Sequence, residues 1–585
     1  MFNMKKELKA LLLTLPFACS LVSCINNDYD LSDIDTTVGI AVNDLVIPVN
    51  LDKITLGDVL DLEDDSQIKE VNGIYAVVKD GTFSSDEIEI PSFSAPAPSI
   101  EPISSVLSID VESFAKASLR TGNKVAKYPI TDANTSFMYH SDDVSEYIIA
   151  AYAFDLNSSL NVDIIVNGLD GITNSFEIEN LSIQLPAGMK AVSDKGVYDE
   201  ETGVLNLGNV TGQNNRFSFK VDFSRVDVEK SGALLKDGKF DFSGEISVKT
   251  GDIAIYDDNF ESGMTVADLP EEVEFKGNAT MSDMSVSTFD GVVCYNIDGI
   301  DVDPISMTDI PDILNQTGTN IILDNPQIYV SMNNPVADKG LSASVGFALT
   351  PIREGETSQA LTLDDDSLVI GHDKPLNENY TFCMSPYKPD TYYTGFEDAE
   401  FCEFSTLGKV LSGTKLPESI NIDVVNPNVW AQEVYGFELG QKLDRVNGTY
   451  SFYAPLALTD NSVIAYKDTI DGWNDEDVDS IEISEAIINA VVTTDVPLAL
   501  DIKAEPIDKY GNVIENLEVK GASVGIKADG QPIEISIKGK IRHLDGIILT
   551  ARAQSGVSDE SLAPGHNISL TDIKAKVSGI YRTEL

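Results

Sequence analysis

Hydrophobic and polar residues alternate along much of the chain. The alternation is clearest at residues 160–166, which read Leu-Asn-Val-Asp-Ile-Ile-Val, and at residues 217–223, which read Phe-Ser-Phe-Lys-Val-Asp-Phe. Residues 498–503 and 533–538 follow the same pattern. Successive side chains of a β-strand point to opposite faces of its sheet, so a period of two predicts strands that bury one face.

Turn-forming residues separate these runs, and helical patterns are rare. Asp-Gly steps of the kind that close tight hairpins occur at residues 80–81, 237–238 and 529–530. Three short helices are expected near residues 58–62, 310–314 and 407–411. Short strands at this spacing favour antiparallel pairing over alternating strands and helices. We therefore predict an all-β chain of tandem antiparallel β-sandwich (immunoglobulin-like) domains with few short helices.

A chain of 585 residues is too long for one hydrophobic core, so several domains are expected. Changes in the strand pattern place breaks near residues 135, 267 and 415. The domains predicted in this way are a β domain at 35–135, an immunoglobulin-like β-sandwich at 136–267, a β domain at 268–415 and a β-sandwich at 416–585.

The beginning of the chain has a different pattern. Lys5, Lys6 and Lys9 precede a mostly apolar run at residues 10–17. A basic segment followed by a short apolar one is typical of a secretory signal peptide, and this run is too short to span a bilayer as a helix. The sequence therefore predicts export.

The segment Leu21-Val22-Ser23-Cys24 follows this run and resembles the bacterial lipobox. The resemblance implies that residues 1–23 are removed and that Cys24 carries acyl chains such as palmitate. Residues 24–34 would then be a lipidated tether. The alternative is an ordinary signal peptide in which a cysteine occurs by chance.

Composition limits the classes of partner. Ninety-five acidic residues against 40 basic ones give a formal net charge of −55. Such a surface repels nucleic acid and anionic lipid headgroups, so neither is an expected partner. Attachment to a membrane would depend on the lipid at Cys24.

Three cysteines follow the lipobox: Cys294, Cys383 and Cys402. Because an exported protein meets an oxidising compartment, Cys383 and Cys402 are a candidate disulfide that would close the loop between them. The alternative is two independent buried thiols, the state expected for Cys294. No spacing of cysteine and histidine indicates structural zinc, so no metal is expected.

Catalytic motifs are also missing from the sequence. The four histidines lie far apart, and there is no GxSxG, HExxH or GxxxxGK[ST] motif. The acidic run at residues 471–482 partly follows the spacing of an EF-hand loop. However, Trp473 stands at a ligand position, and Glu476 stands where that loop needs glycine. The run is better explained as a solvated turn, and we expect neither an enzyme nor a cofactor.

Residues 386–404 are rich in aromatic side chains and offer one candidate ligand site. Tyr387, Tyr392 and Tyr393 could stack against sugar rings beside Lys388 and Asp390. The other interpretation is that the aromatic side chains hold a long loop against its own domain, and we favour it.

Asp28, Asp30, Asp33 and Asp35 follow Cys24 closely. This segment resembles the N-termini of mature Bacteroidota outer-membrane lipoproteins, in which an acidic stretch is associated with export to the cell surface. The resemblance implies a lipid-anchored protein of the outer membrane, exposed on the cell surface. The leading functional hypothesis is a non-catalytic lipoprotein whose β-sandwich domains contact an envelope protein. The alternative is a glycan-binding surface lipoprotein of a polysaccharide uptake system.

Overall fold

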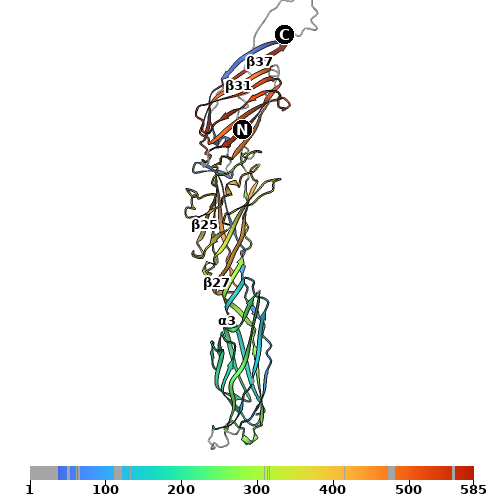
Figure 1. Ribbon diagram of the computed structural model, residues 1–585, viewed down its shortest axis with the longest axis vertical. Helices are drawn as coiled ribbons and strands as arrows, with labels where there is room; N and C mark the ends of the chain where they lie inside the picture. The colour runs from blue at the N-terminus through green and yellow to red at the C-terminus, as the bar shows by residue number, and fades with distance from the viewer. Residues whose placement is uncertain are drawn as a thin grey trace, which may run out of the picture.

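The chain forms a long rod built almost entirely of β-strands (Figure 1). This computed structural model describes residues 37–48, 53–60, 62, 66–110, 122–131, 133–236, 238–307, 310–311, 314, 316–365, 367–413, 415–471, 481–556 and 560–584. The predicted signal peptide, Cys24 and the tether lie outside the described residues. So does most of the acidic run at residues 471–482.

The predicted all-β class is confirmed. Strands form several sheets, and every described strand pair is antiparallel except β25 with β26. The described helices have at most five residues: α2 (Leu56–Leu60), α3 (Val228–Ser231), η1 (Val266–Asp268), η2 (Ala337–Lys339) and η3 (Leu407–Lys409). Two of them, α2 and η3, overlap predicted helices. No described helix has the length and apolar character that crossing a membrane would require.

The end of the rod drawn at the bottom of Figure 1 is the distal lobe, residues 91–296. Two broad sheets share its core: β10 pairs with β15 and β18, while β17 pairs with β11, β8 and β9. Its strands are β6 (Phe93–Ala95), β7 (Ile103–Ser108), β8 (Lys124–Pro129), β9 (Asn134–Ser141), β10 (Ile148–Asn167), β11 (Ser175–Gln184), β12 (Met189–Ser193), β13 (Val197–Asp199), β14 (Val204–Gln213), β15 (Arg216–Asp227), β16 (Leu234–Lys236), β17 (Lys239–Tyr256), β18 (Glu272–Met281) and β19 (Met284–Asn296).

The middle lobe comprises residues 66–90 and 297–458. A six-stranded sheet runs in the order β26-β25-β21-β29-β4-β3, and β27 pairs with β22 and β20 in the facing layer. Its strands are β3 (Ile68–Val71), β4 (Ile74–Ser84), β5 (Ile88–Glu89), β20 (Ile305–Ser306), β21 (Gln327–Asn333), β22 (Ala343–Ile352), β23 (Leu361–Thr362), β24 (Leu368–Ile370), β25 (Asn379–Ser385), β26 (Glu400–Glu403), β27 (Ser419–Glu438), β28 (Lys442–Leu443) and β29 (Asn447–Pro455).

The terminal lobe holds both ends of the described chain. One sheet runs β1-β37-β31-β35-β33, with β2 also paired to β37, and a second runs β30-β36-β32-β34. Its strands are β1 (Thr37–Pro48), β2 (Ile54–Thr55), β30 (Val463–Ile470), β31 (Ile481–Thr494), β32 (Leu498–Asp508), β33 (Glu518–Lys520), β34 (Ala522–Val524), β35 (Gln531–Ile541), β36 (Leu544–Ser555) and β37 (Asn567–Glu584).

The order of the lobes along the chain corrects the predicted domains. The chain starts in the terminal lobe, passes through the middle lobe to the distal lobe and then returns through both (Figure 1). Strand β1 pairs with β37, and β4 pairs with β29. The contiguous domains with breaks near residues 135, 267 and 415 are therefore wrong. The terminal and middle lobes each combine strands from the beginning of the chain with strands from its later part.

One long strand joins the middle and distal lobes. The first part of β27 pairs with β22, and its last part, from Asn428 to Glu438, pairs with β19 of the distal lobe. Buried residues form one continuous cluster through all three lobes, from Phe154 through Phe452 to Leu498. A shared strand and a shared core resist bending, so the rod is held straight at this junction.

Candidate functional site

The outer face of the six-stranded middle-lobe sheet carries the aromatic residues singled out in the sequence. Alternate residues of β4, β29, β21 and β25 point to this face, and the register aligns them in rows across the four strands. One row reads Asp80, Ser451, Tyr329 and Cys383. This face divides into a covered half and an open half.

The loop at residues 386–399 covers the first half. It leaves β25 and returns to β26, which lies parallel to β25, so it must cross the sheet. Tyr393 of the loop stacks on Tyr453 of β29 with ring centroids 4.4 Å apart, and Phe396 stacks on Tyr329 of β21 at 4.5 Å. The backbone N–H of Tyr393 also donates to the Tyr329 hydroxyl at 2.8 Å.

The three tyrosines predicted to stack on sugars differ in their exposure to solvent. Tyr392 and Tyr393 are half-buried and pack against the sheet in one small core with Ala76 and Val78. Tyr387 remains exposed, and its hydroxyl donates to the carboxylate of Asp324. The loop is thus a lid fastened by its own aromatic side chains, and the rings of Tyr392 and Tyr393 are not arranged as a platform for sugars.

The same crossover from β25 to β26 contradicts the predicted disulfide between Cys383 and Cys402. Both residues are free thiols. Cys383 aligns with Phe401, whereas Cys402 aligns with Met384, so the two cysteines lie one position out of step on parallel strands and point to opposite faces. Cys383 lies under the loop, and Cys402 packs against the main core.

We predict that unreduced protein, once denatured, exposes three reactive thiols in the mature chain beyond Cys24. Burial raises the pKa of both thiols, that of Cys402 to about 12, so both should react slowly in the native protein. The measurement is thiol labelling with and without denaturant, counted by mass spectrometry. A count of one after denaturation would show that Cys383 and Cys402 are bridged.

The open half of the face is a grid of neutral polar side chains. The row beside Asp80 reads Thr82, Thr449, Ser331 and Thr381, and the next row reads Ser84, Asn447, Asn333 and Asn379. We call these eight residues the polar grid. All are exposed or half-exposed, and none is charged. Residues between them, such as Phe83 and Met332, point to the other face and are buried.

Few hydrogen bonds occupy the polar grid. Ser331 and Thr381 share one at 2.9 Å, and the side-chain oxygen of Asn333 accepts from the backbone N–H of Asn447 at 2.7 Å. Within the described part of the chain, no hydrogen bond involves the side chains of Thr82, Ser84, Thr449 or Asn379. Their donors and acceptors therefore face solvent.

An open hollow of about 800 Å³ lies over this half of the sheet. Six grid residues line it, together with Leu376 and Asp301. Gly448 and Phe83 also border it; the Phe83 ring occupies the space that a side chain at position 448 would need. The volume is within the usual range for small-molecule sites.

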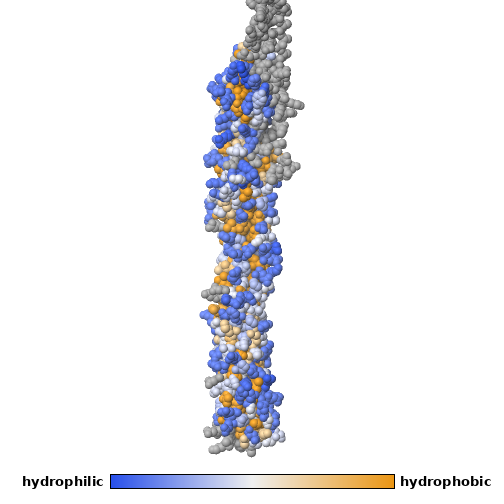
Figure 2. Space-filling model, turned by 90° about the vertical axis from the view of Figure 1, so that its right-hand side faces the viewer, coloured by the Kyte–Doolittle hydropathy of each residue, from blue (hydrophilic) through white to orange (hydrophobic). Residues whose placement is uncertain are grey.

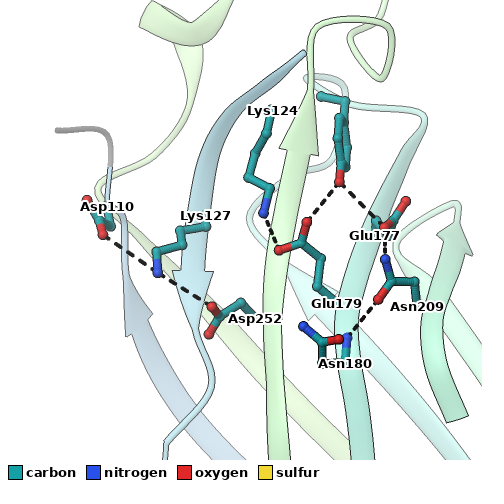
Figure 3. Close-up of polar contacts among 9 residues, drawn as sticks. Asp110, Lys124, Lys127, Glu177, Glu179, Asn180, Asn209 and Asp252 are labelled. Carbon is teal, nitrogen blue, oxygen red and sulfur yellow. Dashed lines mark hydrogen bonds and ion pairs between the residues drawn. The ribbon is translucent and has the colours of Figure 1, made fainter. Parts of the chain in front are cut away.

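Charged clusters elsewhere have the character of structural networks. Figure 3 shows one on the distal lobe, where Lys127 lies between Asp110 and Asp252, at 3.9 and 3.5 Å. Lys124 pairs with Glu179, which also accepts from the hydroxyl of Tyr256 at 2.9 Å. Burial opposes ionisation of Glu179, but these two donors outweigh it and lower its pKa. Lys127 of β8 pairs with Asp252 of the neighbouring strand β17, whereas Lys124 of β8 reaches across β17 to Glu179 of β11. These ion pairs link the three strands.

A second hollow, of about 810 Å³, lies beside His140 in the distal lobe. One ring nitrogen of His140 lies 2.7 Å from Asp241 and the other 3.1 Å from Asp142. These hydrogen bonds raise the pKa of His140 above its ordinary value of 6.5. Among the described residues, no group of histidine, cysteine and carboxylate side chains is arranged to hold a metal ion.

The polar grid escaped the sequence analysis, although a local signal exists. In four strand segments, two uncharged polar residues flank one residue of another kind. The segments are Thr82-Phe83-Ser84, Ser331-Met332-Asn333, Asn379-Tyr380-Thr381 and Asn447-Gly448-Thr449. Each is unremarkable alone. Only the pairing of the four strands places them side by side.

Comparisons with known proteins identify no family. No protein-family model matches the chain, and no curated protein matches it. Among solved structures, a crystal structure of a "putative secreted protein" from Parabacteroides distasonis ATCC 8503 is similar to part of it. The match has a TM-score of 0.34 and 16% sequence identity, and covers 49% of this chain and 89% of that one.

Proposed function

We propose that this protein is a non-catalytic outer-membrane lipoprotein of the Bacteroidota type, and that its rod of tandem, immunoglobulin-like β-sandwiches presents surfaces to an envelope protein. The observation that carries the proposal is the path of the chain. Thr37, where β1 begins, lies in the terminal lobe, and the distal lobe is the far end of the rod (Figure 1). A lipid on Cys24 would hold the terminal lobe at the membrane.

A rod attached at one end holds its other end away from the membrane. The strand β27, which the middle and distal lobes share, would prevent the rod from bending between them and so keep the distal lobe away from the membrane. The net charge of −55 would repel the anionic headgroups below. These properties support a projecting surface lipoprotein, and cell-surface exposure is part of the proposal.

The junction of the middle and distal lobes offers a surface for a partner. Tyr152 of β10 and Tyr435 of β27 donate hydrogen bonds to opposite oxygens of Glu433, at 3.2 and 3.1 Å. Tyr435 is 71% exposed, and Trp430 on the same strand is 38% exposed. Exposed tyrosine and tryptophan are enriched at protein interfaces, where they contribute much of the binding energy. On the face in Figure 2, hydrophobic residues lie in groups among hydrophilic ones.

The proposal is tested by affinity purification from outer membranes solubilised in mild detergent. We expect a specific envelope protein to be recovered with the wild-type chain and lost with the double substitution Trp430→Ala and Tyr435→Ala. The matched control is Tyr510→Ala, which removes a 77% exposed tyrosine from the terminal lobe. Recovery of no membrane protein, by purification or by cross-linking in intact cells, would contradict the proposal.

A further inference from the structure

We infer that the polar grid is a binding site for a neutral oligosaccharide. This inference goes beyond the proposed protein contacts, and neither depends on the other. It rests on the chemistry of the eight grid residues, on the hollow above them and on the absence of charge from the grid.

Hydrogen-bonding capacity is the first argument. A sugar hydroxyl both donates and accepts, so its recognition favours side chains that do the same. Every grid residue is serine, threonine or asparagine, whose hydroxyl or amide provides both functions. Unpaired side chains of Thr82, Thr449, Ser84 and Asn379 have this capacity available, since no described residue bonds them.

Charge is the second argument. No lysine or arginine lines the hollow, so an anionic ligand would find no counterion. Asp301 is the single carboxylate among the lining residues, too few to hold a divalent cation. In a chain in which 23% of residues are charged, the lining of this hollow thus carries a single charged side chain. A neutral polyhydroxyl compound is the ligand that this surface matches.

Shape is the third argument. The grid has two residues, two positions apart, on each of four neighbouring strands, which gives a regular array of donors and acceptors. Strands lie about 4.8 Å apart, close to the length of one sugar unit, so successive sugars would meet successive strands. Leu376, which lines the hollow and is 43% exposed, offers an apolar surface for the C–H face of a sugar. The aromatic residue that lines the hollow, Phe83, is buried, so the lining offers a protein partner no exposed aromatic anchor.

The test measures binding of neutral oligosaccharides to the purified full-length chain by isothermal titration calorimetry. The panel contains glucan, mannan, xylan and galactan fragments of about six sugars, which are long enough to cross the four strands of the grid. We expect saturable binding of at least one fragment and none of polygalacturonate, an anionic polymer of similar build.

Asn379→Ala combined with Thr449→Ala is expected to weaken that binding about tenfold or more, since two hydrogen-bonding groups are lost. The control is Asn161→Ala combined with Thr280→Ala, an exposed, directly paired asparagine and threonine in the distal lobe. Thr82→Ala is a second grid variant, and circular dichroism verifies that each variant is folded.

Three results would overturn the inference. The first is that no neutral fragment binds saturably. The second is that both grid variants bind as tightly as the wild type. The third is that the distal-lobe control loses as much affinity for the fragment as the grid variants do. Recovery of a protein partner in the affinity experiment leaves these readouts unchanged, so the inference and the proposed function fail separately.

Discussion

Cys24→Ala is expected to move the protein from the membrane fraction to the soluble fraction of the cell envelope. Each buried methylene of an acyl chain contributes about 0.8 kcal/mol to membrane binding, and stable anchoring takes more than one chain. The net charge of −55 is expected to repel anionic headgroups. Loss of the lipid should therefore release nearly all of the protein.

The measurement is fractionation followed by immunoblotting, with metabolic labelling by a radioactive fatty acid. Cys19→Ala is the matched control, because it removes the other cysteine of the leader and leaves Leu21-Val22-Ser23-Cys24 intact. That control should remain labelled and bound to the membrane. If the Cys24 variant still sediments with membranes after a high-salt wash, the lipobox interpretation is wrong.

Gly448→Ala is expected to lower the free energy of unfolding of the middle lobe by about 3 kcal/mol. Gly448 of β29 is paired with Phe83 of β4, and a Cβ at position 448 would lie 2.2 Å from the Phe83 ring. The ring is buried in the main core, so it cannot move aside without leaving a cavity. Gly81 and Tyr450 repeat this arrangement in the same strand pair.

Unfolding in guanidinium chloride, followed by intrinsic fluorescence, measures the effect. Gly277→Ala in β18 is the control, because a Cβ there would lie 3.7 Å from Ile103, an ordinary contact. That substitution should be neutral or slightly stabilising, since alanine restricts the unfolded chain. Equal stabilities of the two variants would show that the packing of the Phe83 ring does not require glycine at position 448.

Much of the secondary structure could be read from the sequence. The alternating segments at residues 160–166 and 217–223 lie in β10 and β15, and all their apolar residues except Ile165 are buried. The segments at 498–503 and 533–538 lie in β32 and β35. Alternation succeeds here because burial of one face is a local property of each strand. The favoured interpretation of Tyr392 and Tyr393, as residues that hold their own loop, also agrees with the structure.

The pairing of strands could not be read in the same way. Alternation shows which side chains of a strand are buried, but it does not name the neighbouring strand. Ser451 donates to Asp80 across 371 residues of sequence, and β1 pairs with β37 over a still longer separation. Linear domain boundaries failed for this reason. The disulfide prediction failed because a parallel crossover, rather than a closed hairpin, separates Cys383 from Cys402.

The sequence by itself determined the β class of this chain, its acidic charge and its predicted export, because these follow from local pattern and composition. Tertiary structure alone decided the nested lobes and the polar grid. Asn333, Asn379 and Asn447 lie far apart in sequence and become neighbours only when β21, β25 and β29 hydrogen-bond in one register. A surface assembled from single residues of several strands exists only once those strands have paired.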